Sequence, residues 1–434
     1  MLLRGLIILG ITLMPALSWS ADSKLENVDL PTVLKLAGAQ NLEIEIAEQK
    51  LREAQAREDG TIWQLFPTIS PGVAYQNHAG MLQSFSGPVS DVNKESIQAG
   101  ATVQIRLELG EAIYRRLAAQ QLTIAAGHQL ESQRQLTLLE AASGYFELVG
   151  AQANEAITAE AFRIAQDFHR QVEAAVKAGL THQGDALRAY AQMNRALLAQ
   201  QKATDTRHLA AARLAQTLRL HITGELRAVD LHPTPLSLSL PANPVSDLIN
   251  LALQHRPEIA EAEALNAAAT ENSNAARYAP LYPTLNAQVF GGGLGGSPAS
   301  SQTNFGRSTD TLVSLTWKIG PGGIFDNSRE RTAQAAEAQS RLGQERVRET
   351  ITREVVEAQG TVKILQSQLQ HAQDAVKATQ QGLKLSLQRR EFAVGAVLET
   401  LQSQQDALQS QQDYLQTITE LNKAQYRLKH ALGE

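Results

Sequence analysis

The chain contains one pattern twice, and this repetition limits the possible folds more than any other feature of the sequence. FPTI at Phe66 corresponds to YPTL at Tyr282. The glycine of KAGLTHQGDAL, Gly179, corresponds in the same way to Gly395 of AVGAVLETLQS. Both pairs are separated by about 216 residues, and landmarks at a constant offset are the signature of a structural repeat. Each half of the chain should therefore form the same unit.

The repeat divides the sequence into four parts. Residues 1–20 contain one arginine, an apolar run and then small residues, which is the pattern of a cleaved secretory signal peptide. The apolar run, at about 12 residues, is shorter than the roughly 20 that a membrane-spanning helix needs. We expect the first repeat over 21–230 and the second over 245–434. Between them, 231–244 is rich in proline and cannot continue a helix.

Each half should contain a helix, a pair of strands, a very long helix, a glycine turn and a further helix. The first half predicts these elements at 29–64, 68–77, 96–109, 111–177 and 185–221, and the second half at 245–278, 285–291, 311–319, 324–392 and 399–432. At 1.5 Å per residue each long helix would reach roughly 100 Å, and the two shorter helices placed end to end would match it. Apolar residues on these helices recur at coiled-coil spacing, as in the steps from Ile351 to Val376. The helices alone are equally compatible with a coiled-coil rod.

The predicted strands favour a membrane barrel over a rod. They alternate apolar and polar residues, so each has one apolar face. No helix remains to cover that face, and transmembrane strands need roughly 9–11 residues, as the longer strands here provide. The segments 77–95 and 291–310 are polar and glycine-rich, as are the outer loops of such barrels. The residues expected to face lipid are Val103, Ile105, Leu107, Val313, Leu315 and Trp317.

Four strands cannot close a barrel, and an open sheet edge cannot lie in lipid. Several copies of the chain must therefore contribute to one barrel with a polar lumen. The predicted fold class is α+β and mainly α: a shared β-barrel with four strands from each protomer, continued by a long helical coiled-coil barrel.

Several short motifs resemble those of the TolC-type outer-membrane efflux protein family. They are RPEI at Arg256, the P-x-Y-P-x-L form at Pro280, WKIGPGGIFD at Trp317 and the two glycine turns. The first half departs from them, with QNLEI at Gln40 and LELGEAIY at Leu107. The resemblance implies a homotrimer with a twelve-stranded barrel in the outer membrane and its helices in the periplasm. It also implies a passive exit duct that works with a periplasmic adaptor protein and an inner-membrane pump.

The resemblance further implies two functional regions at the helix-hairpin tips. The residues that would contact the adaptor are Ala178, Gly179, Leu180, Thr181, Val394, Gly395, Ala396 and Val397. Family members similar to this chain narrow the pore with acidic residues, and the corresponding positions here are Glu399 and Gln402. Glu399 is equally well explained as an acid at a helix N-terminus, and the same two interpretations apply to Asp185.

Other classes of function have little support in the sequence. The chain has 39 basic and 44 acidic residues, a net charge of −5, and no basic surface that would suggest nucleic acid. Cysteine is absent, and no closely spaced histidines, phosphate-binding loop or catalytic constellation is present, so we expect no metal, cofactor or enzymatic activity. Within the duct interpretation, the lack of His- or Met-rich segments favours small molecules over metal cations as cargo. The alternatives are an exit duct for type I protein secretion and a periplasmic coiled-coil scaffold that does not conduct.

Overall fold

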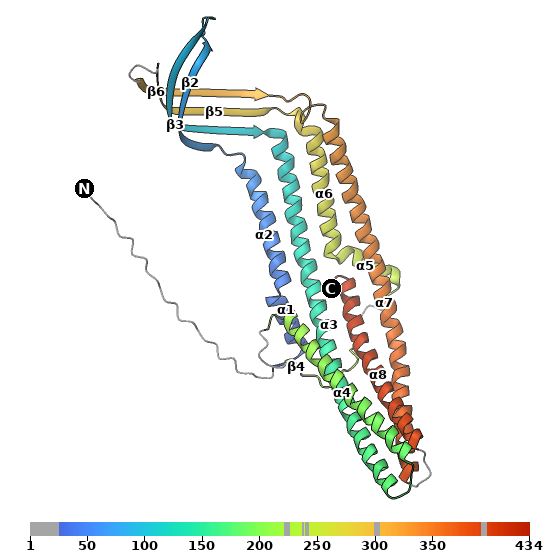
Figure 1. The fold of residues 1–434 in the computed structure, drawn as a ribbon. Helices are drawn as coiled ribbons and strands as arrows, with labels where there is room; N and C mark the ends of the chain where they lie inside the picture. The colour runs from blue at the N-terminus through green and yellow to red at the C-terminus, as the bar shows by residue number, and fades with distance from the viewer. Residues whose placement is uncertain (1–25, 221–225, 237, 239–242, 299–303, 392–396) are drawn as a thin grey trace, which may run out of the picture. The chain divides into compact units, whose positions relative to one another are not determined.

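The computed structural model of the protein describes residues 26–220, 226–236, 238, 243–298, 304–391 and 397–434 (Figure 1). The predicted signal peptide, residues 1–20, lies outside the described residues. The elements of the first half are β1 (Glu26–Val28), α1 (Leu30–Gln40), α2 (Leu42–Trp63), β2 (Thr68–Gln83), β3 (Val89–Glu108), α3 (Leu109–Lys177), α4 (Gln183–Thr217) and β4 (Leu226–Ala228). Those of the second half are α5 (Val245–His255), α6 (Pro257–Tyr278), the 3-10 turn Ala279–Leu281, β5 (Thr284–Pro298), β6 (Asn304–Thr316), α7 (Asn327–Glu391) and α8 (Val397–Ala431). Both halves thus have the same order of a divided helix, a strand pair, a long helix and a further helix.

A four-stranded antiparallel sheet joins the two halves of the chain. Its strand order is β2-β3-β5-β6, so that each half supplies one hairpin and the central pairing is between β3 and β5. Across the sheet Ile105 lies opposite Ala287, and Ala287 lies opposite Val313. Directly paired residues point to the same side of a sheet, so the register brings the predicted apolar positions of the two halves together on one side.

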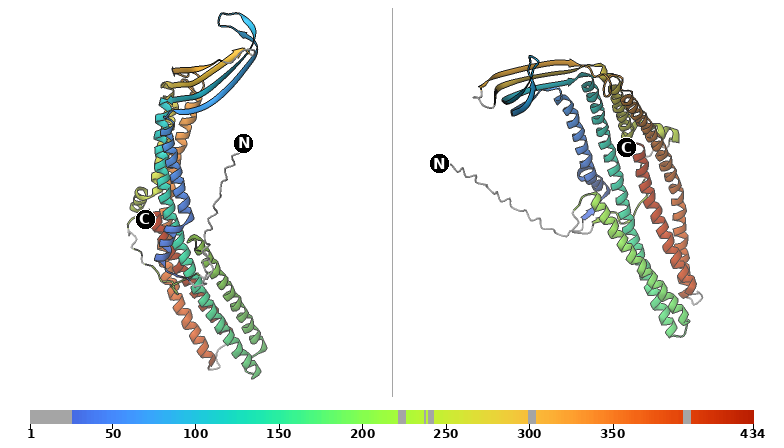
Figure 2. Two further views of the ribbon diagram at one scale, coloured as in Figure 1. Left: turned by 90° about the vertical axis from the view of Figure 1, so that its left-hand side faces the viewer. Right: turned by 45° about the horizontal axis from the view of Figure 1, so that its top comes forward.

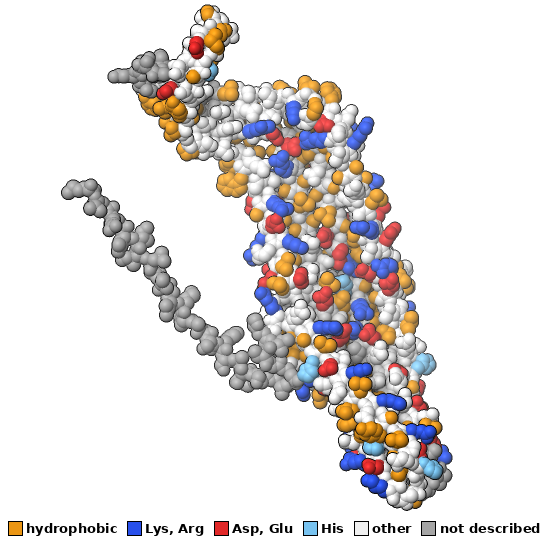
Figure 3. All heavy atoms as spheres, in the orientation of Figure 1, with side chains coloured by type: hydrophobic (Ala, Val, Ile, Leu, Met, Phe, Trp, Pro, Cys, Tyr) orange, Lys and Arg blue, Asp and Glu red, His pale blue; other side chains and the backbone are white. Residues whose placement is uncertain are grey.

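The sheet has an apolar face and a polar face. The apolar face carries Val103, Ile105, Leu107, Leu285, Ala287, Val289, Val313 and Leu315, and the polar face carries Gln104, Arg106, Glu108, Thr284, Asn286, Gln288, Ser314 and Thr316. Val313 is 65% exposed and Leu315 is 52% exposed, so no described element covers this apolar surface. In Figure 3, charged side chains are frequent over the helices and sparse over the strands.

The strands are longer than the sequence predicts. Most of 77–95 continues the first hairpin, with pairs from Asn77 and Glu95 to Gln83 and Val89, and much of 291–310 continues β5 and β6. Glycine and polar residues have low strand propensity, but backbone hydrogen bonds to a neighbouring strand override that preference. In the other direction, 317–319 was predicted to be strand but follows the end of β6 as a loop.

The first helix predicted in each half, 29–64 and 245–278, is two helices in the structure, whereas the last helix of each half is a single helix, α4 or α8. The break in 29–64 lies at Asn41, whose side chain accepts a hydrogen bond of 2.8 Å from the backbone N–H of Glu43 and so begins a new helix. The break in 245–278 lies at Arg256, which is extended (φ −70°, ψ 125°) before Pro257. A residue before proline avoids helical geometry, and proline suits the first position of a helix.

The described residues form two compact units. One unit consists of the described residues within 36–143, 235–371 and 420–434, and these ranges include the sheet. Its main helical core consists of side chains from α5, α6, α7 and α8, among them Leu248, Ile259, Ile351, Val355 and Leu428. The polar side chain of Asn422 in α8 is also buried there and accepts a hydrogen bond of 2.9 Å from the N–H of Leu236, which ties the linker between the halves to this helix.

The other unit contains residues 26–35, 144–220, 226–234, 372–391 and 397–419. Here α4 runs beside the C-terminal part of α3, and α8 runs beside the C-terminal part of α7 (Figure 2). Buried alanines line one side of α4, including Ala189, Ala196 and Ala203. Small side chains let helices approach closely, which explains how an alanine-rich chain with few aromatics packs. No helix among the described residues of the protein is both long enough and apolar enough to cross a membrane.

Candidate functional site

The polar face of the sheet leads into a cavity of about 620 Å³ at the ends of the strands near the helices. Arg106, Glu108 and Lys318 line it together with the hydroxyl and amide side chains of Thr284, Asn286 and Thr316. Arg106 donates a hydrogen bond of 2.8 Å to Glu108. In the same cavity wall, Arg329 of α7 donates a hydrogen bond of 2.8 Å to Glu111 of α3. This bond links the first turns of the two long helices. The lining is polar and close to charge balance, which suits passage of solutes better than tight binding.

A glycine-rich loop connects β6 to α7 beside this cavity. The carboxylate of Asp326 accepts hydrogen bonds from the N–H groups of Gly322 (2.7 Å) and Arg329 (3.0 Å), and these donors hold its pKa below the ordinary value. Gly322 has a φ of 74°, which glycine adopts without strain. The loop therefore fixes where α7 begins. Trp317, predicted to face lipid, lies at its start and donates a hydrogen bond of 3.3 Å to the carbonyl of Leu281.

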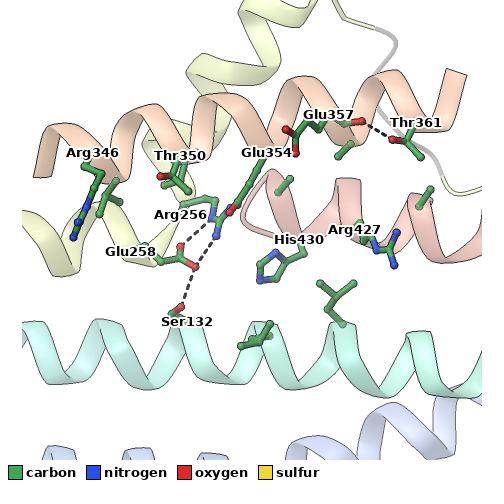
Figure 4. Close-up of a pocket in the computed structure, with 17 residues that line it drawn as sticks. Ser132, Arg256, Glu258, Arg346, Thr350, Glu354, Glu357, Thr361, Arg427 and His430 are labelled. Carbon is green, nitrogen blue, oxygen red and sulfur yellow. Dashed lines mark hydrogen bonds and ion pairs between the residues drawn. The ribbon is translucent and has the colours of Figure 1, made fainter. Parts of the chain in front are cut away.

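A buried arginine lies at the junction of four helices in the same unit (Figure 4). The side chain of Arg256 is 5% exposed and donates two hydrogen bonds to Glu258 (2.7 and 2.9 Å) and one to Glu354 of α7. Ser132 of α3 donates a further bond of 2.9 Å to Glu258. Burial disfavours the charged form of Glu258, but the guanidinium outweighs it and keeps the pKa of Glu258 below its usual value. This cluster ties α3, α6 and α7 together.

The cluster lines a cavity of about 630 Å³ whose wall also includes His430 and Arg427 of α8 (Figure 4). Burial lowers the pKa of His430, and the positive charge of Arg256 lowers it further. His430 is thus neutral at neutral pH. The rest of the wall combines apolar side chains, such as Leu136 and Ile351, with polar ones, such as Thr350 and Glu357. The mutual pairing of Arg256, Glu258 and Glu354 indicates a structural junction.

The predicted first tip is a tight helix ending. Gly179 has a φ of 71°, and the N–H of Leu180 reaches back to the carbonyl of Ala175 (2.9 Å), the pattern of a glycine-terminated helix. Ala178 and Gly179 are exposed, and Leu180 is 80% exposed. The structure therefore presents an apolar side chain to the surroundings at this turn.

Asp185 does not project freely from the start of α4. Its carboxylate accepts a hydrogen bond of 2.9 Å from the hydroxyl of Thr181 and forms an ion pair of 3.3 Å with Arg188. These contacts favour the helix-start interpretation of Asp185.

The second predicted tip is described only in part. Val394, Gly395 and Ala396 lie outside the described residues, and Val397 is the first residue of α8. Val397 packs with Leu401 against a cluster formed by Phe168, Val172, Ala186 and Ala189. Glu399 forms an ion pair of 2.8 Å with Arg389 of α7, and Gln402 is exposed. The arginine offsets the charge that Glu399 would bring to a constriction.

Sequence reasoning missed the Arg256 cluster and the cavity at the strand ends. Arg256 was noted only as part of a motif, because Glu354 lies far along the chain and Ser132 belongs to the other half. The only local signal was the neighbouring Glu258. Within the described parts of the chain, no group of three or more histidine, cysteine or acidic residues could hold a metal ion.

The sequence model described as "Outer membrane efflux protein" matches residues 33–218 and 248–434. The fold is similar to that of the outer-membrane channel OprN, with 22% identity over 93% of this chain and 89% of that chain, and a TM-score of 0.79. It is also similar to the CmeC outer-membrane channel of Campylobacter jejuni (16% identity, 99% and 94% coverage, TM-score 0.78). For the MtrE channel of Neisseria gonorrhoeae in its open state, the identity is 19%, the coverage 93% and 88%, and the TM-score 0.72. No curated protein matches the chain.

Proposed function

Because the chain belongs to the outer membrane efflux protein family, we propose that it is the outer-membrane exit duct of a tripartite efflux system. Three copies would form one barrel in the outer membrane, with the helices in the periplasm. A periplasmic adaptor protein and an energised inner-membrane pump would deliver the cargo. The duct conducts passively, so it requires neither a cofactor nor catalysis.

The observation that carries this proposal is the four-stranded sheet with one exposed apolar face. Its outer strands, β2 and β6, have no further partner among the described residues. An apolar face suits lipid, but unpaired strand edges are not tolerated there, so neighbouring copies must pair with both edges. The lipid-facing residues of this arrangement are Val103, Ile105, Leu107, Val313, Leu315 and, at the end of the strand, Trp317. The polar face, with Arg106 and Lys318 at its base, then lines the lumen.

The tips are the proposed contact with the adaptor. Ala178, Gly179, Leu180 and Thr181 form the first contact, and Val394, Gly395, Ala396 and Val397 form the second. Exposed Leu180 supports this role for the first tip. We place the periplasmic constriction at Glu399 and Gln402, with Asp185 nearby. Because Glu399 is paired with Arg389 and position 402 is an amide, this constriction is less selective for cations than a ring of free carboxylates.

The cargo we propose is small organic molecules. The wide, hydroxyl- and amide-rich polar face carries few unpaired charges, and no cluster of metal ligands occurs in the described part of the chain. Such a surface suits solutes of varied structure.

The test combines purification, conductance and deletion. The mature protein should require detergent for extraction, run as a trimer and form pores in planar bilayers. Deleting it should increase sensitivity to dyes and antibiotics. A mature protein that stays soluble without detergent and forms no pore would establish the non-conducting scaffold instead. An unchanged sensitivity panel together with the loss of one secreted protein would identify a secretion duct.

A further inference from the structure

Among the described strand residues, Arg307 of β6 is the one cation on the apolar face of the sheet; the acidic residues on this face, Asp91 and Glu95, lie further toward the tip of the first hairpin. Along β6, Phe305, Arg307, Thr309, Thr311, Val313 and Leu315 point to this face by strand alternation. Arg307 is exposed, and its side chain makes no ion pair or hydrogen bond with the described residues. Its direct partner on β5 is Gly293, and the next residue across, on β3, is Ala99. No carboxylate can therefore neutralise it from these positions.

The position of Arg307 along the strand sets its depth in a membrane. From Leu315 to Phe305, ten residues at about 3.4 Å each on a strand tilted by about 40° span about 26 Å along the membrane normal. That matches the apolar band of an outer-membrane barrel, about 25 Å tall. Aromatic residues lie at both ends: Trp317, half-exposed and also in the wall of the polar cavity, follows the end of β6, and Phe305 and Tyr75 share one row at the far end. Arg307 therefore lies just inside the end that is remote from the helices.

An arginine at this depth needs an anion. A lipid-facing guanidinium is costly at the middle of a bilayer and is tolerated near an interface, where it reaches the head groups. The ring of Phe305 leans over Gly293, so closely that a Cβ atom there would be 2.1 Å from the ring. Because Gly293 is also the direct partner of Arg307, the ring and the base of the arginine are neighbours. The guanidinium can then bind phosphate through two parallel hydrogen bonds, while the ring contacts acyl chains.

We propose that Arg307 and Phe305 bind a phosphate-bearing glycolipid of the outer leaflet, such as lipid A. The inference rests on the proposed function, because it requires that the apolar face meets lipid and that the helices are periplasmic. The guanidinium binds a lipid phosphate, and Phe305 packs against the acyl chains beside it.

The full chain would be placed in phosphatidylcholine nanodiscs containing a small fraction of diphosphorylated lipid A, and lipid A retained by each trimer would be counted by native mass spectrometry. We expect the wild-type protein to retain this lipid about tenfold more than its dephosphorylated form, as the loss of one charge-assisted contact predicts. Arg307→Gln should abolish the difference, and Arg307→Lys, which keeps the charge but cannot form two parallel hydrogen bonds, should keep only part of it. Lys94→Gln is the matched control, since Lys94 is an exposed cation on the opposite face of β3, and it should behave like wild type.

Three results would overturn the inference. The wild-type protein could retain the diphosphorylated and dephosphorylated forms of lipid A equally, or Arg307→Gln could retain as much diphosphorylated lipid A as wild type does. The third result is that phosphatidylglycerol, offered in place of lipid A, is retained as strongly as diphosphorylated lipid A. The comparison of lipids on the wild-type protein needs no variant to fold. Conductance of the same preparation separates the two proposals. A trimer that conducts but shows no phosphate preference contradicts only the lipid site, whereas a preparation without trimers or pores contradicts the proposed function.

Discussion

At the residue scale, the buried Arg256 cluster depends more strongly on its partners than the exposed ion pairs of the helices do. Replacing Arg256 with methionine should leave Glu258 and Glu354 close together without their cation. Removing one partner of a buried ion pair costs about 3–5 kcal/mol, and we expect a loss of free energy of unfolding of that order in urea titrations followed by circular dichroism. The control is Arg348→Met, which breaks an exposed pair with Glu263 and should cost less than about 1 kcal/mol. Equal effects of the two substitutions would show that burial of Arg256 does not matter.

His430 makes the same region sensitive to acid. Burial and the charge of Arg256 lower its pKa in the folded protein. Below the ordinary histidine pKa of about 6.5, the unfolded chain binds a proton that the folded chain resists, so stability is full above that pH and falls as the pH decreases. Thermal midpoints measured between pH 7.5 and 5 should therefore decline in wild type and decline less in His430→Gln. Parallel curves would contradict the assignment.

At this scale, the sequence predicts contacts between residues that are close along the chain but not contacts between distant helices. Asp185 could be given two roles from sequence, and its bonds to Thr181 and Arg188 favour one of them because both partners lie within one turn. Arg256 could not be paired with Glu354 from sequence, since a contact between distant helices depends on how those helices pack. Local chemistry was therefore predictable, and long-range ion pairing was not.

At the element scale, the central pairing of β3 with β5 depends on glycine. A Cβ atom at Gly292 would lie 2.3 Å from the carbonyl oxygen of Ala99, whereas one at Gly291 would have no atom within 4 Å. Gly292→Val should therefore prevent assembly of the barrel, while Gly291→Val, on the apolar face, should be tolerated. The measurement is the amount of heat-resistant trimer extracted from outer membranes. Normal assembly of Gly292→Val would mean that the strands can separate enough to accept a side chain.

The first hairpin tip allows backbone strain to be separated from contact. Leu180→Asp changes an exposed side chain without altering the turn, while Gly179→Ala puts a small side chain at a positive φ and should cost about 1 kcal/mol locally. If the tip contacts the adaptor, Leu180→Asp should abolish export while the trimer still inserts, and Gly179→Ala should reduce export only slightly. Drug-sensitivity assays with quantified trimer provide the measurement. Unimpaired export by Leu180→Asp would move the contact elsewhere.

The long helices and the four strands of the large sheet were predicted from the sequence, but the short parallel pair of β1 with β4 and most strand ends were not. The long helices were placed within a few residues because their apolar spacing persists over many turns. The outer parts of the strands were read as loops because Gly291 to Gly296 carry few side chains, and only pairing with β3 and β6 makes them strands. The breaks at Asn41 and Pro257 had recognisable capping and proline signals, yet the continuous apolar pattern on either side concealed them.

At the scale of the whole molecule, the repeat explains why one chain would supply only part of the proposed barrel. Each half contributes one hairpin, the two hairpins pair through β3 and β5, and the strands left at the edges belong to different halves. Closure by identical copies then requires β6 of one copy to pair with β2 of the next. Rotational symmetry makes every such junction equivalent.

The absence of cysteine in the sequence makes this closure directly testable. A cysteine at Ser70 of β2 combined with one at Ser308, Leu312 or Ser314 of β6 places both thiols on the polar face, and the three choices sample the unknown register. At least one pair should form covalent dimers and trimers under mild oxidation, because paired strands bring Cβ atoms to about 5 Å. Ser70 combined with Gln288 is the control: β5 lies one strand inside the β6 edge, so a neighbour's β2 cannot reach it. Cross-linking should appear as a ladder on denaturing gels that collapses on reduction. Monomers alone for all three pairs, in protein that still inserts into the membrane, would contradict closure through β2 and β6.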